Sequence, residues 1–164
     1  MGLHVEATSG TPLLLLRERE SPFRVVPIFI GELEAASIAI ALSGQTPPRP
    51  LAHDLMATLV NRLDVHVDSV EVTDMVDGAF IATLNLSGPT GGHHLDTRPS
   101  DAIALAVRVG APLFVRDTVL DEAGAIIEES EDEGVIGDKL SIDESVAEFR
   151  SFLDAVDPDD FTLP

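Results

Sequence analysis

The sequence predicts an α+β domain, in which a mixed, largely antiparallel sheet packs against about three helices, plus an acidic C-terminal tail with one amphipathic helix. Three observations predict this class. Stretches of alternating apolar residues, typical of strands, separate three stretches with helical spacing. The pair Asp77-Gly78 is typical of a tight β-hairpin turn, and acidic residues gather near the C-terminus. We divide the chain into a domain over residues 1–125, an acidic linker over 126–138 and a helical tail over 139–164.

The N-terminal part is predicted to form two strands and one helix. Residues 13–17 are a short apolar run and residues 24–30 are rich in β-branched side chains, so both are predicted strands. Because Pro27 has no N–H to donate, the second strand should lie at a sheet edge or carry a bulge there. Residues 32–42 are rich in alanine and place apolar residues at helical spacing, and Gly44 follows as a helix cap.

A second helix and a β-hairpin are expected next. Over residues 51–63 leucine recurs at every fourth position, which predicts an amphipathic helix whose leucines pack on a core. Residues 65–75 alternate like a strand, but the apolar phase shifts at Asp68-Ser69, which indicates a β-bulge. The turn pair Asp77-Gly78 tolerates positive φ and should lead back into a strand over residues 79–86.

The last part of the domain is predicted to hold a loop, two short strands and a third helix. The glycine-rich residues 88–92 should form a flexible loop that moves over a functional site near Asp96 and Arg98. A brief strand is expected at residues 93–97. Residues 99–109 are apolar on nearly all sides, so this helix should be buried, and residues 112–115 should form a strand. In the tail, an amphipathic helix is marked by Val146, Phe149, Phe152, Leu153 and Val156.

Composition excludes several classes of function. The 164 residues are 45% hydrophobic, which is enough for one domain with a real core. The chain has no cysteine, which excludes disulfides, thiolate metal sites and a cysteine nucleophile. The N-terminus lacks the basic and apolar regions of a signal peptide, and no apolar run approaches the ~18 residues of a membrane span. We therefore expect a cytoplasmic protein.

The net charge of −19 limits the partners of the protein. Residues 117–164 hold 16 of the 29 acidic residues and two of the ten bases, so this segment carries −14 and the rest −5. A nucleic acid should therefore bind only weakly or transiently, because few bases are present to neutralise its phosphates. A basic protein partner suits the acidic tail.

Two Arg-Pro elements stand out, one at Arg49-Pro50 with His53-Asp54 and one at Arg98-Pro99 with Ser100-Asp101. Both place proline at the start of a predicted helix and an aspartate in its first turn. A structural role explains this pattern, since proline suits the first helical position and aspartate offsets the helix dipole. A functional role explains it equally well, and we weigh the two equally for Asp54 and Asp101.

In the functional interpretation, the two elements converge on one cleft that performs phosphodiester chemistry. Carboxylates hold Mg²⁺ or Mn²⁺, arginines bind phosphate in a bidentate manner, and histidine transfers protons near neutral pH. The residues assigned to these roles are His53, Asp54 and Asp101 for catalysis, Arg49, Arg98 and Ser100 for substrate binding, and Asp54, Asp96 and Asp101 for metal binding.

Three ordered motifs, at residues 28–35, 49–55 and 96–106, resemble the bifunctional nuclease domain family. The resemblance covers about residues 10–125. It implies an α+β domain and the hydrolysis of both RNA and DNA. In this chain Ala52 replaces the threonine that is usual in the family, and Ile81 replaces an aromatic residue, so one hydroxyl contact and one base-stacking surface are absent.

Two further hypotheses follow from the same sequence. In one, the chain is a non-catalytic binding or regulatory module whose Arg-Pro elements are structural braces and whose acidic tail contacts a protein partner. In the other, apolar faces of the helices at 32–42 and 99–109 pack between subunits of a homo-oligomer, with the site at the interface.

Overall fold

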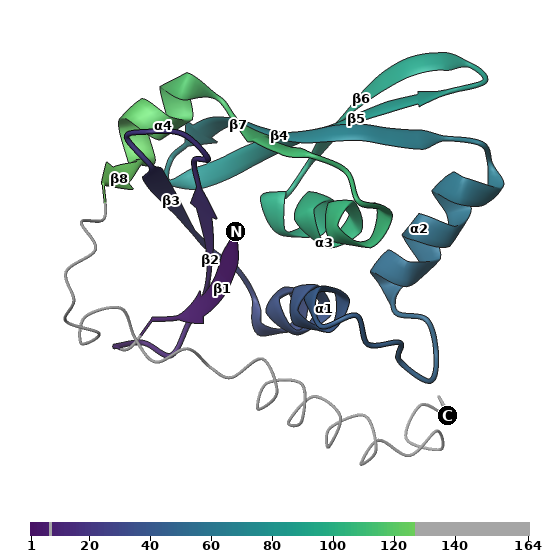
Figure 1. The fold of residues 1–164 in the computed structure, drawn as a ribbon, viewed down its shortest axis with the longest axis horizontal. Helices are drawn as coiled ribbons and strands as arrows, with labels where there is room; N and C mark the ends of the chain where they lie inside the picture. The colour runs from purple at the N-terminus through teal and green to yellow at the C-terminus, as the bar shows by residue number, and fades with distance from the viewer. Residues whose placement is uncertain (7, 127–164) are drawn as a thin grey trace.

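The computed structural model describes residues 1–6 and 8–126, which form four helices and two four-stranded sheets (Figure 1). The elements in chain order are β1 (Gly2–Val5), β2 (Pro12–Arg17), β3 (Arg24–Phe29), α1 (Glu32–Leu42), α2 (Ala52–Arg62), β4 (His66–Val76), β5 (Ala79–Gly88), β6 (Gly91–Thr97), α3 (Pro99–Val109), β7 (Leu113–Val115), α4 (Asp117–Ala123) and β8 (Ala125–Ile126). No helix within these described ranges is long and apolar enough to cross a membrane. The predicted tail helix and nearly all of the acidic linker lie outside the described residues.

The first sheet has the strand order β1-β2-β3-β8 and is antiparallel throughout. β8 pairs with β3 only at Arg24 and Val25. Pro27 is paired with Leu15 of β2 on one side and lies beyond the reach of β8 on the other. The predicted edge position of Pro27 is therefore confirmed, since its missing N–H interrupts no ladder there.

The second sheet has the order β6-β5-β4-β7, and only the β4–β7 pair is parallel. The predicted bulge is confirmed by a register shift between Val67 and Ser69. The predicted hairpin turn is also confirmed, because Asp77 and Gly78 have φ angles of 51° and 80°. The α+β class is correct, but the strands divide between two sheets rather than one.

The expected flexible loop at residues 88–92 is a tight turn instead. Gly88 pairs with Gly91, so the strands continue through the glycines and leave only Pro89 and Thr90 between them. Glycine provides the φ of 106° that this turn needs at residue 91. The turn lies at the opposite end of β6 from Arg98, about 20 Å away for a strand of this length, and does not cover that residue.

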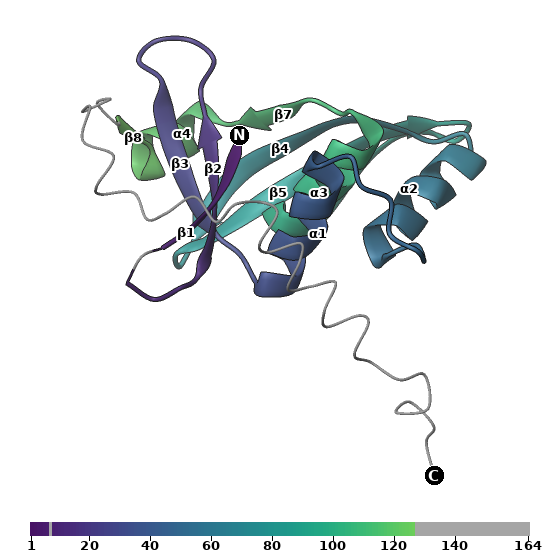
Figure 2. The same cartoon turned by 60° about the horizontal axis from the view of Figure 1, so that its bottom comes forward.

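Helix α3 lies between the second sheet and α1, with α2 beside it (Figures 1 and 2). This confirms the burial that its apolar sequence predicted. Both sheets and three of the helices contribute to one core, whose largest fully buried side chains are Leu14, Val26, Ile38, Val70, Val72, Ile103 and Val119.

The oligomer hypothesis assigned the apolar faces of α1 and α3 to a contact between subunits. In the structure these two helices pack against each other inside one chain, because that contact buries both apolar faces together. These apolar faces are therefore not available for a contact with a second subunit. A homo-oligomer stays a prediction, and it would have to form through another surface.

Candidate functional site

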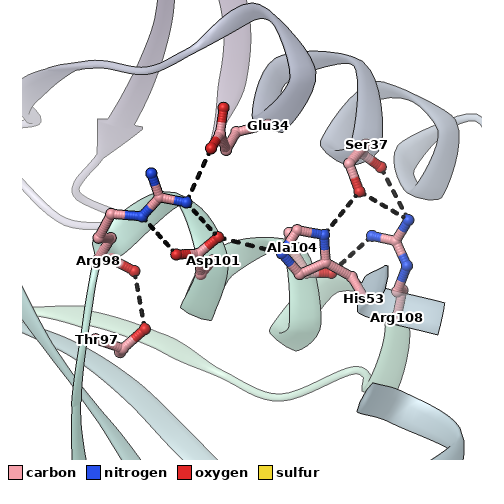
Figure 3. A network of polar contacts seen from close by, with 8 residues as sticks. All are labelled: Glu34, Ser37, His53, Thr97, Arg98, Asp101, Ala104 and Arg108. Atoms are coloured by element: carbon pink, nitrogen blue, oxygen red, sulfur yellow. Dashed lines mark hydrogen bonds and ion pairs between the residues drawn. The ribbon is translucent and has the colours of Figure 1, made fainter. Parts of the chain in front are cut away.

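The two Arg-Pro elements meet in a chain of polar contacts, beside the start of α1 (Figure 3). His53 Nε2 of α2 lies 3.4 Å from Asp101 Oδ1 of α3, although the two residues are 48 positions apart in the sequence. This contact brings one residue from each of the two elements together. The side chains in this network are Glu34 and Ser37 of α1, His53 and Asp54 of α2, Asp101 and Arg108 of α3, and Arg98 immediately before α3.

Arg98 holds two carboxylates at the exposed end of the network. Its Nε and Nη2 donate to the two oxygens of Asp101 at 2.6 and 2.9 Å, and Nη2 also donates to Glu34 at 2.8 Å. These bonds from Arg98 hold the pKa of Asp101 below its ordinary value, against the opposing effect of burial. The Arg98 side chain is 65% exposed, and its Nη1 has no partner among the described residues. Nη1 is thus available to an incoming anion.

Gly31 leaves room for Glu34 to reach Arg98. Gly31 is the residue before α1, and Glu34 lies in the first turn of that helix. A Cβ atom on residue 31 would collide with the Glu34 carboxylate. The sequence Gly31-Glu32-Leu33-Glu34 therefore positions a carboxylate at the site as well as offsetting the helix dipole.

His53 is buried at the centre of the network, with 8% of the residue exposed. Its Nδ1 lies 3.0 Å from Ser37 Oγ, which also accepts a hydrogen bond from Arg108 Nη2 at 3.1 Å. We assign the neutral ring a hydrogen on Nε2, because a lone pair there would face the Asp101 carboxylate. Nδ1 then accepts the hydrogen of the Ser37 hydroxyl. Hydrogen bonds are thus donated in one direction along the series, from Arg108 to Ser37, from Ser37 to His53 and from His53 to Asp101.

Asp54 and Arg108 form the buried end of the network. Asp54 Oδ1 accepts from Arg108 Nε at 2.5 Å, and Oδ2 accepts from the Leu51 backbone N–H at 2.8 Å. Burial raises the pKa of Asp54, but the bonds from Arg108 and Leu51 together hold it below its ordinary value. The structural interpretation of Asp54 is therefore supported, since this carboxylate caps α2 and fixes it to α3.

Three of the predicted site residues do not join the network. Arg49 is exposed and makes no hydrogen bond or ion pair with another described residue. Ser100 is 7% exposed, and its hydroxyl makes none of the contacts described above. Asp96 is exposed on β6. Their proposed roles in binding substrate or metal stay predictions.

The predicted metal ligands Asp54, Asp96 and Asp101 do not fit one metal site. Asp54 is bound by Arg108 and Asp101 by Arg98, so two different guanidinium groups occupy the carboxylate oxygens that a cation would need. Across residues 1–6 and 8–126, no group of three or more histidine and acidic side chains is arranged to hold a metal ion. We therefore derive no chemical step through a metal, and metal dependence stays a prediction.

Glu34, Ser37 and Arg108 belong to this network but were not predicted from the sequence. Ser37 has the only hydroxyl group in α1, and Arg108 is the only base in α3. A polar residue within the apolar part of a helix must find a partner if it is buried. That signal indicates a buried polar contact, but it does not identify the partner.

Stability is expected to fall when the pH drops below about 4. The folded-state pKa values of Asp101 and Asp54 lie below their ordinary value of about 3.9, so the unfolded chain binds protons first as the pH falls. The stability from these groups is complete above that ordinary value and is lost as the pH falls through the folded-state pKa values. Urea unfolding of the protein at micromolar protein concentration, between about pH 3 and pH 7, would measure this change in the free energy of unfolding. Asp101→Asn should reduce the dependence on pH, and an unchanged dependence would contradict the assignment.

Comparison with known proteins relates this chain to a domain family and to several proteins of similar sequence. The sequence pattern of the bifunctional nuclease domain matches residues 14–128. An uncharacterised protein of Mycobacterium tuberculosis is 40% identical over 162 residues, which cover 98% of this chain and 94% of that protein. Bifunctional nuclease 1 of Arabidopsis thaliana is 27% identical over 132 residues, and bifunctional nuclease 2 of Oryza sativa is 25% identical over 118. These alignments cover 79% and 70% of this chain, but only 41% and 36% of the two plant proteins.

Proposed function

This chain belongs to the bifunctional nuclease domain family, and on that premise we propose that it hydrolyses phosphodiester bonds of RNA, DNA or both. One observation carries the proposal, namely the His53–Asp101 pair beside an exposed arginine nitrogen. A phosphodiesterase needs a group that stabilises negative charge on the phosphate and a group that transfers protons. Arg98 and the His53–Asp101 pair supply these two functions within one contact network.

In the proposed reaction, Arg98 Nη1 donates to an oxygen of the scissile phosphate. The oxygen of a water molecule forms the new bond to phosphorus, and its proton passes to the His53–Asp101 pair. The bond from phosphorus to the leaving oxygen breaks, and that oxygen receives the proton that the pair accepted from water, which returns the pair to its starting state. Asp101 is the member of the pair that reaches solvent, because its side chain is 28% exposed and that of His53 is 11% exposed.

Ser37 and Arg108 act as positioning residues in this proposal. Arg108 donates to the Ser37 hydroxyl, and that hydroxyl donates to His53 Nδ1. The hydrogen of the neutral ring therefore stays on Nε2, next to Asp101. A proton-transfer pair with a fixed tautomer does not need to reorganise before each step. A cytoplasmic location and assistance by Mg²⁺ or Mn²⁺ remain predictions from the sequence.

Asp101→Asn is expected to lower the rate of cleavage by about 10²–10⁴-fold, because the amide does not accept a proton as a carboxylate does. Labelled single-stranded RNA and DNA would be incubated with highly purified protein in Mg²⁺, Mn²⁺ or EDTA. Asp117→Asn is the matched control, because it makes the same change in the first turn of α4, on an exposed residue outside the network. Equal cleavage by both folded variants would contradict the proposal, because contaminating nuclease would then explain the activity.

A second candidate function is a binding or regulatory module. One observation favours it, since Glu34 and Asp101 place two negative charges around the single positive charge of Arg98. The net negative charge around Arg98 disfavours the binding of a phosphate. It suits a structural role, in which Arg98 connects α1 to α3 through these two ion pairs. Absence of cleavage by the unaltered protein in all three metal conditions would favour this function over the nuclease.

A further inference from the structure

The leucines of α2 were expected to pack on a core, but Leu55, Leu59 and Leu63 are exposed on the side of the helix away from it. His53 and Ala57 face inward, where Ala57 packs on the core and His53 joins the polar network. On the outer side, four large apolar side chains are between 44% and 64% exposed. This group, which we name the α2 stripe, consists of Leu55, Met56, Leu59 and Leu63. The outer face of a surface helix is normally polar, and a contiguous apolar patch of this kind marks a contact surface.

Figures 1 and 2 both show α2 at one end of the fold, with its outer side turned away from the other labelled elements. Arg49 precedes the helix by three residues and Arg62 is its last residue, and both are exposed. The stripe therefore lies between two positive charges. A suitable occupant has an apolar face about three turns long and acidic residues at both of its ends.

We propose that the C-terminal segment of the same chain, residues 143–160, docks on the α2 stripe. Its sequence places five apolar residues at helical spacing over residues 146–156, an 11-residue span that equals the length of α2. Asp143 and Glu144 precede these residues, and acidic residues also follow them, at Asp157, Asp159 and Asp160. The segment thus has both the apolar face and the terminal charges that the stripe requires.

The intervening chain is long enough for this contact. Twenty residue steps separate Ile126, at the end of β8, from Val146. Fully extended, they span up to about 66 Å, whereas a domain of this size has a radius of gyration of only about 14 Å. Every part of the domain surface is therefore within reach.

The contact would be tested on the full chain by paramagnetic relaxation. Since the protein has no cysteine, Ser151→Cys provides one attachment point for a nitroxide, on the side of the predicted tail helix opposite its apolar residues. We expect selective broadening of the amide signals of α2 and of the methyl signals of Leu55, Leu59 and Leu63. Phe149→Ser with Phe152→Ser should abolish the broadening, whereas the control Ala155→Ser, on the other side of the segment, should retain it.

A second measurement separates a contact within the chain from one between two chains. Nitroxide-labelled protein would be mixed with isotope-labelled protein that lacks the nitroxide. Broadening of α2 in this mixture would overturn the proposal in favour of a second copy, and no broadening in either sample would overturn it entirely. Docking within the chain also predicts that amide exchange in α2 becomes about tenfold faster in the double phenylalanine variant. This inference does not depend on nuclease activity, so each can fail without the other.

Discussion

Arg98→Ala is expected to lower the rate of phosphodiester cleavage by about 10²–10³-fold, the usual effect of removing one donor that stabilises a developing negative charge. Of the two arginines in the network, only Arg98 has a nitrogen that is available to a ligand. The side chain of Arg108 is 7% exposed, and its three nitrogens all donate hydrogen bonds to groups of α1, α2 and α3. The measurement is kcat/KM on labelled single-stranded RNA and DNA. Arg19→Ala serves as the control, because Arg19 is an exposed arginine outside the network.

The fold should survive Arg98→Ala. An ion pair with an arginine that is 65% exposed contributes about 0–1 kcal/mol to the free energy of unfolding, so thermal unfolding should change little. Arg98→Lys keeps the positive charge but does not donate to Asp101 through two fixed nitrogens, and it should recover only part of the rate. Full activity of a folded Arg98→Ala protein would remove Arg98 from the mechanism.

Local sequence patterns predicted most of the elements, because those patterns depend on near neighbours. Helical spacing and alternation predicted α1, α2, α3 and the β4–β5 hairpin within a few residues. The strands β1 and β8 and the helix α4 were not predicted. Two of these are very short, and all three are stabilised mainly by pairing or packing with distant segments, which no local pattern encodes.

The division of strands between two sheets has the same explanation. Alternation identifies a strand and its buried face, but it does not identify the strand's neighbour. Residues 13–17 and 24–30 could have joined the sheet of β4 as far as their sequences are concerned. In the structure they pair with each other and with the short β1 and β8, which decides the architecture.

The candidate site was predictable in part. The Arg-Pro elements identified His53, Arg98 and Asp101, since proline and aspartate mark a helix start that presents charges together. The opposite side of the network was missed, because Glu34 and Ser37 of α1 enter the site only through the packing of α1 against α3. Asp96 was assigned by its closeness in sequence to Arg98, but it is exposed on β6 and makes none of the network's contacts.

Arg108→Met is expected to lower the free energy of unfolding by about 3 kcal/mol, because it leaves a partly buried carboxylate without its cation. Methionine preserves much of the apolar stem, so the loss reports the guanidinium rather than a cavity. Arg108 donates to Asp54, to the carbonyl groups of Ala104 and Ser37, and to the Ser37 hydroxyl. Urea unfolding at pH 7 would measure the change, and a loss well under 1 kcal/mol would contradict this account of the buried network.

The double variant Arg108→Met with Asp54→Asn distinguishes the unpaired charge from the lost hydrogen bonds. The amide oxygen of asparagine still accepts the Leu51 N–H, so the cap of α2 is retained while the negative charge is removed. We expect the double variant to be about 1–2 kcal/mol more stable than Arg108→Met alone, a coupling that only residues in contact display. If the second change adds further loss, the cost lies in the bonds to Ala104 and Ser37. Arg108 would then act mainly as a brace between α1 and α3, and its removal should disturb His53 through the freed Ser37 hydroxyl.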